Sequence, residues 1–89
     1  MNEKITDTTN DVVAAVRVTP MVKGAIIADK MLNDPKNHIN VESISGVVTL
    51  NGHVTSEELK NHAESITKRV IVDNKFSESV SNMLVVTPH

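Results

Sequence analysis

The chain of 89 residues contains no cysteine, no tryptophan and no tyrosine, and Phe76 is its single phenylalanine. Without cysteine it forms no disulfide, carries out no thiol chemistry and binds no metal through thiolates. Without a set of aromatic side chains it lacks the stacking platforms that bind bases, sugars and quaternary amines. These absences exclude several classes of site but do not identify the compartment.

Charge of one sign and long hydrophobic runs are missing as well. Nine Lys and Arg residues against 11 Asp and Glu residues give a net charge of −2, with no basic block. This balance argues against nucleic acid as a partner, and the chain has no G-x-x-G loop of the kind that clamps RNA. No apolar run approaches the roughly 18–20 residues that span a membrane. The first residues do not read as a signal peptide, because Lys4 stands alone and acidic residues precede the short apolar run 12–16.

The first half of the chain predicts a helix after a polar start. Residues 11–18 (DVVAAVRV) suit either a short helix or a strand. Thr19 is the expected N-cap of a helix over residues 20–32, with Pro20 in its first turn. We attribute Gly24, inside this helix, to close packing against a neighbouring element. The apolar stripe of the helix consists of Met21, Val22, Ala25, Ile26, Ala28 and Leu32.

Two dipeptides compete for the next turn, Ser45-Gly46 and Asn51-Gly52. A turn at Asn51-Gly52 leaves a returning strand of only three residues before the helix signal at Ser56. A turn at Ser45-Gly46 pairs residues 39–44 with residues 47–54, two strands of useful length. We therefore place the turn at Ser45-Gly46 and Gly52 inside a strand, where its missing side chain is expected to let a helix approach the sheet.

The second half predicts a helix and a last strand. Ser56 is the expected N-cap, and Leu59, Ala63, Ile66 and Val70 form an apolar stripe. Residues 79–86 alternate as one strand. The predicted fold class is therefore α+β: an αββαβ two-layer sandwich with two helices packed on one face of a three-stranded mixed sheet.

The segments VKGAI, INV, GVVTLNGHV, AESITKRV and VSNMLVV resemble the BON domain, the bacterial osmotically-inducible-and-nodulation domain. The resemblance covers residues 20–86 and divides the chain into an N-terminal extension over 1–18 and a BON-like domain over 19–87. One departure from the family pattern is the link IVDNKFSESV, which is longer than usual and lacks a glycine. The residues that match the family pattern are Gly46, Val48, Leu50, Gly52, Val54, Val80, Asn82, Leu84 and Val86.

The resemblance implies a non-catalytic binding or scaffold module of the bacterial envelope that acts in stress or envelope maintenance. Phospholipid or an envelope protein is the implied partner. The periplasm or cell envelope is the implied location if an export signal lies outside this chain, and the cytoplasm otherwise. The alternative is a structural protein that forms homo-oligomers through the apolar N-terminal segment or a sheet edge.

The sequence contains no motif that is typical of catalysis or cofactor binding. We expect no enzyme activity, no catalytic residue, no cofactor and no metal site, because there is no nucleophile elbow, P-loop or dinucleotide motif. The spacing of His38, His53, His62 and His89 matches no metal signature, so solvated surface histidines are expected. The candidate interaction surface is the sheet face opposite the helices, with Val47, Thr49, Met83 and Val85.

Overall fold

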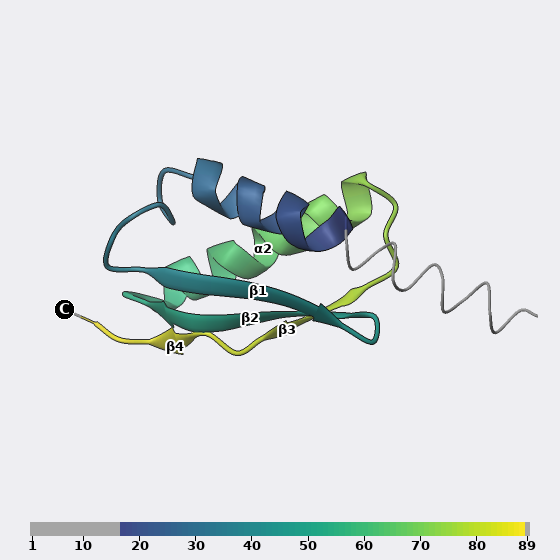
Figure 1. The fold of residues 1–89 in the computed structure, drawn as a ribbon. Helices are drawn as coiled ribbons and strands as arrows, with labels where there is room; N and C mark the ends of the chain where they lie inside the picture. Colours follow the sequence, from purple (N-terminus) through teal and green to yellow (C-terminus); the bar gives the residue numbers. More distant parts are fainter. Residues whose placement is uncertain (1–16, 89) are drawn as a thin grey trace, which may run out of the picture.

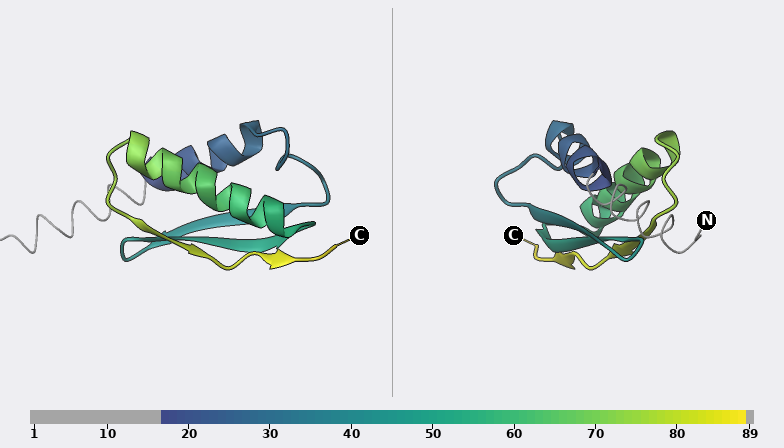
Figure 2. Two further views of the ribbon diagram at one scale, coloured as in Figure 1. Left: turned by 180° about the vertical axis from the view of Figure 1, so that it is seen from behind. Right: turned by 45° about the vertical axis from the view of Figure 1, so that its right-hand side comes forward.

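The computed structural model describes residues 17–88, which form two helices and a mixed sheet of four strands. The first helix is helical over residues 17–28. It is followed by β1 (His38–Ile44), β2 (Val47–Val54), α2 (Glu57–Asp73), β3 (Ser79–Asn82) and β4 (Val85–Val86). Both helices lie on the same face of the sheet, as Figures 1 and 2 show. The α+β class is confirmed, and so is the placement of both helices on one side.

The sheet is organised around β2, which pairs antiparallel with β1 and parallel with both β3 and β4. The turn between β1 and β2 lies at Ser45-Gly46, as predicted, with φ angles of 51° and 79°. Two consecutive positive φ values are typical of the tight turn whose twist matches that of paired strands. This turn fixes the register, which sets Ile44 opposite Val47 and His38 opposite His53.

The expected single strand over residues 79–86 is divided in two. Asn82 pairs with Leu50 and Val85 with His53, so the register on β2 is the same before and after the break. At the break, the side-chain oxygen of Asn82 accepts a hydrogen bond from the backbone N–H of Leu84 at 3.2 Å. A side chain that takes a backbone donor in this way competes with the strand ladder. The sheet therefore has four strands rather than three.

The first helix differs from its prediction at both ends. Residues 17–19 are already helical, so Thr19 is not the N-cap, and the helix stops at residue 28 rather than 32. Val18, assigned from the sequence to the N-terminal extension, is fully buried in the core. Arg17 is described too, and residues 1–16 of that extension lie outside the described residues.

α2 begins as predicted and ends three residues later than its apolar stripe suggested. The Ser56 hydroxyl accepts a hydrogen bond from the backbone N–H of Leu59, which confirms the N-cap. At the other end, the backbone N–H groups of Lys75 and Phe76 donate to the carbonyls of Val72 and Ile71. These two bonds form a Schellman motif, with Lys75 at φ 60° in the left-handed position that glycine usually occupies. This Schellman motif lies in the link IVDNKFSESV, the segment that departs from the family pattern.

The core lies between the helices and the sheet, and it is built from aliphatic side chains of every major element. Figure 2 shows the two helices side by side above the strands. The buried core residues are Val18, Val22, Ile26, Leu32, Val41, Val48, Leu50, Val54, Ala63, Ile71 and Leu84.

Both glycine interpretations from the sequence are wrong. A Cβ on Gly24 would meet no atom within 4 Å, so no close packing explains this residue. At Gly52, what comes close is not a helix but the neighbouring strand: an added Cβ would lie 1.9 Å from the backbone oxygen of His38. Gly52 also has a φ of 121°. Its missing side chain therefore allows β1 and β2 to approach each other at His38.

Candidate functional site

The four residues expected on the open sheet face lie on two different parts of it. Val47 and Thr49 are half-buried on β2 near the hairpin turn. Met83 and Val85 are 60% and 59% exposed at the break in the last strand. Val85 is opposite His53, six residues further along β2 than Val47, which corresponds to roughly 20 Å along the sheet. The structure therefore does not bring the four side chains into one compact cluster.

Polar side chains flank the part of this face at Val47 and Thr49. Ser79 and Ser81 of β3 lie opposite Val47 and Thr49, and Glu42 of β1 pairs with Thr49. No strand of the described chain carries a lysine or arginine on this face. The open sheet face therefore combines separated apolar side chains with no cationic group.

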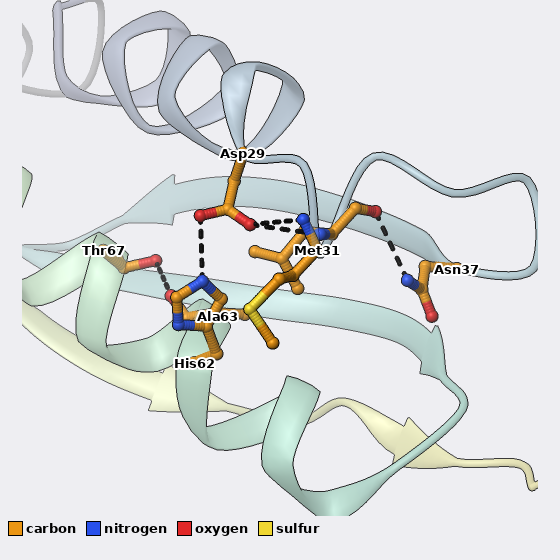
Figure 3. Close-up of polar contacts among 7 residues, drawn as sticks. Asp29, Met31, Asn37, His62, Ala63 and Thr67 are labelled. Carbon is orange, nitrogen blue, oxygen red and sulfur yellow. Dashed lines mark hydrogen bonds and ion pairs between the residues drawn. The ribbon is translucent and has the colours of Figure 1, made fainter.

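A second exposed apolar surface lies on the outer side of the first helix, and it was not predicted from the sequence. Ile27 is 64% exposed, and Met31, in the turn that follows the helix, is 56% exposed. Lys23 lines a pocket with Ile27 above β1, whereas the Met31 side chain extends toward α2 (Figure 3). Lys23 and Lys30 are both exposed. We call these four residues the helix patch. The sequence signal for it was the apolar Ile27 next to the core residue Ile26, which widens the stripe beyond one buried face.

The charge of the helix patch is positive. Residues 17–28 include Arg17 and Lys23 and no acidic residue. The Arg17 guanidinium lies over the Phe76 ring, 5.7 Å from its centroid, so its charge is held at one end of the helix. Apolar side chains flanked by lysines are typical of surfaces that bind anionic membranes.

Two acidic residues lie close to the patch: Asp34 lines a pocket with Ile27, and Asp29 is occupied by other contacts (Figure 3). One carboxylate oxygen accepts hydrogen bonds from the backbone N–H groups of Met31 and Leu32 at 2.9 and 3.2 Å. The other oxygen lies 2.8 Å from Nε2 of His62 on α2. His62 is therefore a half-buried partner of Asp29, and its expected role as a solvated surface histidine is wrong.

The same contacts set the ionisation of Asp29. Burial raises its pKa, but the hydrogen bonds from His62, Leu32 and Met31 together with the His62 charge outweigh burial and hold the pKa below its usual value. Asp29 is therefore ionised at neutral pH. It joins the end of the first helix to α2 and fixes the backbone that carries Met31.

Two other histidines come together on the open sheet face. His38 and His53 are directly opposite each other on β1 and β2, with ring centroids 5.9 Å apart and ring planes inclined by 24°. His89 lies outside the described residues. Among residues 17–88 no three His, Cys, Asp or Glu side chains converge as a metal cluster, and neither helix is long and apolar enough to cross a membrane.

The residues of the family pattern occupy structural positions. Val48, Leu50, Val54 and Leu84 are buried in the core. Asn82 donates from Nδ2 to the Lys60 carbonyl of α2 at 2.9 Å, so it fastens the last strand to the helix layer. These positions explain the fold and do not identify a ligand.

Comparison with known proteins agrees with this architecture. A family model of the BON domain matches residues 14–88. The chain is also similar to Osmotically-inducible protein Y of Escherichia coli (strain K12), with 40% identity over 52 residues. The matched segment is 58% of this chain and 25% of that relative's length.

Proposed function

The chain belongs to the BON domain family, and on that premise we propose that it is a non-catalytic docking module of the bacterial envelope that binds anionic phospholipid through the helix patch. The name of its relative, an osmotically inducible protein, supports a role in stress or envelope maintenance and a periplasmic or envelope location. The module works by surface contact and makes or breaks no bond.

The observation that carries this proposal is the combination of exposure and charge on the first helix. Ile27 and Met31 would insert between lipid headgroups, while Lys23 and Lys30 would meet the phosphates. The open sheet face offers apolar residues of similar exposure but no cation, so it suits anionic lipid less well. Because the chain as a whole carries a charge of −2, attraction to anionic lipid would depend on these local lysines.

Co-sedimentation with lipid vesicles tests the proposal. The full chain is expected to sediment with phosphatidylglycerol vesicles at low salt and to be released by salt, because screening weakens exposed charge contacts. Vesicles of phosphatidylcholine should retain much less protein. Absence of binding to both kinds of vesicle at low salt would remove the lipid proposal.

Matched variants assign the surface. Ile27→Ser combined with Lys23→Gln should release the protein from anionic vesicles. Val72→Ser is the control, because Val72 is 71% exposed on α2 and lies outside the helix patch. Met83→Ser with Val85→Ser should leave lipid binding intact. If these sheet variants abolish binding and the helix variants do not, the open sheet face is the lipid-binding surface instead.

The free edge of β1 supports a second candidate function, formation of homo-oligomers. β1 pairs only with β2 in the described chain, so its outer backbone groups can accept another strand. Analytical ultracentrifugation of the full chain and of a chain lacking residues 1–18 tests this function and the contribution of the N-terminal segment. A monomer in both cases would rule it out. Because Val18 is a core residue, a chain that lacks only residues 1–16 is the control.

A further inference from the structure

The open sheet face carries a square of two histidines and two asparagines. His38 and Asn40 of β1 share this face and pair with His53 and Asn51 of β2, respectively. Both histidines and Asn40 are exposed, and Asn51 is half-buried. The Asn40 side-chain nitrogen lies 3.3 Å from Nε2 of His38. We call these four residues the His–Asn square.

Two features of the backbone create this square. The Ser45-Gly46 turn sets the register that places like residue opposite like residue in the segments HIN and NGH. Gly52, between Asn51 and His53 in sequence, allows the His38 carbonyl to approach at a distance that a Cβ would forbid. The two imidazoles are therefore held on neighbouring strands by rigid backbone rather than by a flexible loop.

The geometry of the rings is suited to a shared metal ion. Two imidazoles bonded to one ion at about 2 Å have ring centroids roughly 5–6 Å apart. The observed separation is 5.9 Å, but the rings are stacked with planes inclined by 24°, so both rings must turn before their in-plane nitrogen lone pairs point at one ion. Both rings are exposed, so each can turn about its Cβ–Cγ bond to direct a nitrogen toward the ion without disturbing the core. The amide oxygens of the two asparagines are additional ligands of the kind that complete a nitrogen and oxygen set.

The donor set identifies the class of ion. Imidazole nitrogens select borderline transition metals, whereas Mg²⁺ and Ca²⁺ prefer sites made wholly of oxygen. Cu²⁺ binds tightest among the first-row divalent ions and accepts mixed nitrogen and oxygen ligands in a tetragonal arrangement. We propose that the His–Asn square is a surface site for a divalent transition-metal ion, tightest for Cu²⁺, with His38 and His53 as the two nitrogen ligands and water completing the coordination.

The side chains of the square lie on the face of the sheet that the helices do not cover (Figure 2). At the edge strand β1 the two sites are close, because His38 lines a pocket with Ile27 and Asn40 lines one with Lys23 and Ile27, but they share no residue. His62 is on α2 and is paired with Asp29, so it is not a ligand and serves as an internal control. Metal binding and lipid binding can therefore be tested separately, and failure of one leaves the other standing.

Calorimetric titration of the full chain without a histidine tag, using Cu²⁺ as the probe, tests the site. One ion per chain is expected, with Zn²⁺ weaker and Mg²⁺ silent. Binding should weaken as the pH falls from 7.5 to 5, because the imidazoles must be unprotonated to coordinate. Electron paramagnetic resonance of the Cu²⁺ complex is expected to show two nitrogen ligands.

Matched variants decide between this site and other histidines. His38→Gln and His53→Gln should each lower the affinity by on the order of tenfold or more and remove one nitrogen from the Cu²⁺ spectrum. His62→Gln should change neither measurement. Cu²⁺ binding that persists unchanged in the His38→Gln, His53→Gln double variant would overturn the proposal. Far-ultraviolet circular dichroism of the metal-free variants verifies that both remain folded.

Discussion

Gly52 is the residue at which the backbone of this fold is least tolerant of a side chain. Its φ of 121° lies in a region that residues with a Cβ rarely adopt. The His38 carbonyl occupies the place that a Cβ would take, only 1.9 Å away. A substitution must therefore push β1 away from β2 and distort Gly52 at the same time.

We predict that Gly52→Ala lowers the free energy of unfolding by about 2–4 kcal/mol, from strain at the positive φ and from the displaced strand. Urea unfolding followed by circular dichroism measures the change. Since the same displacement separates His38 from His53, the variant should also lose Cu²⁺ affinity. A variant as stable as the parent would contradict the close approach of the two strands.

Gly24→Ala is the matched control, with the opposite expected sign. A Cβ at Gly24 meets nothing within 4 Å, and the residue lies in a helix on the exposed side. Alanine should therefore stabilise the protein by about 0.5–1 kcal/mol, because glycine is the poorer helix former. Together the two variants separate a glycine that the backbone requires from one that it does not.

For individual residues, the sequence predicted the secondary-structure element better than the contacts within the fold. Placing the turn at Ser45-Gly46 put Gly52 inside a strand, which is correct. The predicted close neighbour of Gly52, a helix, was wrong. Alternation of apolar and polar residues identifies the face on which a residue lies, but it does not encode the φ angle or the path of the neighbouring strand. The His38–His53 pair followed from the same turn, since residues equally distant from a hairpin turn face each other, but a search limited to spacings along the chain misses it.

The C-terminal end of α2 forms a Schellman motif without the glycine that usually occupies its left-handed position. The hydrogen bonds of Lys75 and Phe76 complete a Schellman motif, and Phe76 packs against the core near Ile71. Lys75 nevertheless takes a left-handed conformation, with φ of 60°, which costs a residue with a side chain about 1–2 kcal/mol. The bonds and packing around it hold Lys75 there.

We predict that Lys75→Gly raises the free energy of unfolding by about 1 kcal/mol, because glycine adopts this conformation without the steric cost. Thermal and urea unfolding provide the measurement. Lys75→Ala removes the same charge but keeps the Cβ, so it should not reproduce the gain. Equal stabilisation by both variants would assign the effect to charge instead of backbone geometry.

The sequence predicted the elements well where caps and turns are strong, and less well where tertiary contacts decide. Ser56 and the Ser45-Gly46 turn were identified because each has a local hydrogen-bonding or conformational signature. The first helix was misplaced because Thr19-Pro20 looks like a helix start, although the helix already includes Val18. The last strand was taken as continuous because nothing local shows that Asn82 bonds to Leu84 and to α2.

At the scale of the whole molecule, two surfaces of different chemistry meet at the edge strand β1. The helix patch has lysines and exposed aliphatic side chains, and its residues Lys23 and Ile27 line a pocket with β1. The side chains of the His–Asn square lie on the sheet face that the helices leave uncovered, and His38 and Asn40 also line pockets with Ile27 at the edge of β1. A membrane bound at Ile27 and Lys23 would therefore lie close to the β1 side of the square. Sequence periodicity predicted which strand residues share the open sheet face. It did not predict the helix patch, since most apolar residues of 20–32 were assigned to the buried stripe of that helix.

Two carboxylates connect the parts of the molecule, and both favour the folded state only when ionised. Asp29 joins the first helix to His62 of α2. The pKa of Glu64 on α2 is held below its usual value by hydrogen bonds from Lys68 and Asn82, which outweigh burial. The pKa of Asp29 is also lowered. The folded protein therefore binds fewer protons than the unfolded chain in mildly acidic solution.

We predict that the free energy of unfolding falls as the pH is lowered from about 5 toward 3, because the unfolded carboxyls, with pKa values near 4, take up protons before the folded ones do. Above that window the contribution of both groups is fully present. Urea unfolding at a series of pH values measures the slope. Asp29→Asn with Glu64→Gln should make the slope shallower, since neither amide takes up a proton. The same slope in the parent and in this double variant would show that the two contacts do not link folding to protonation.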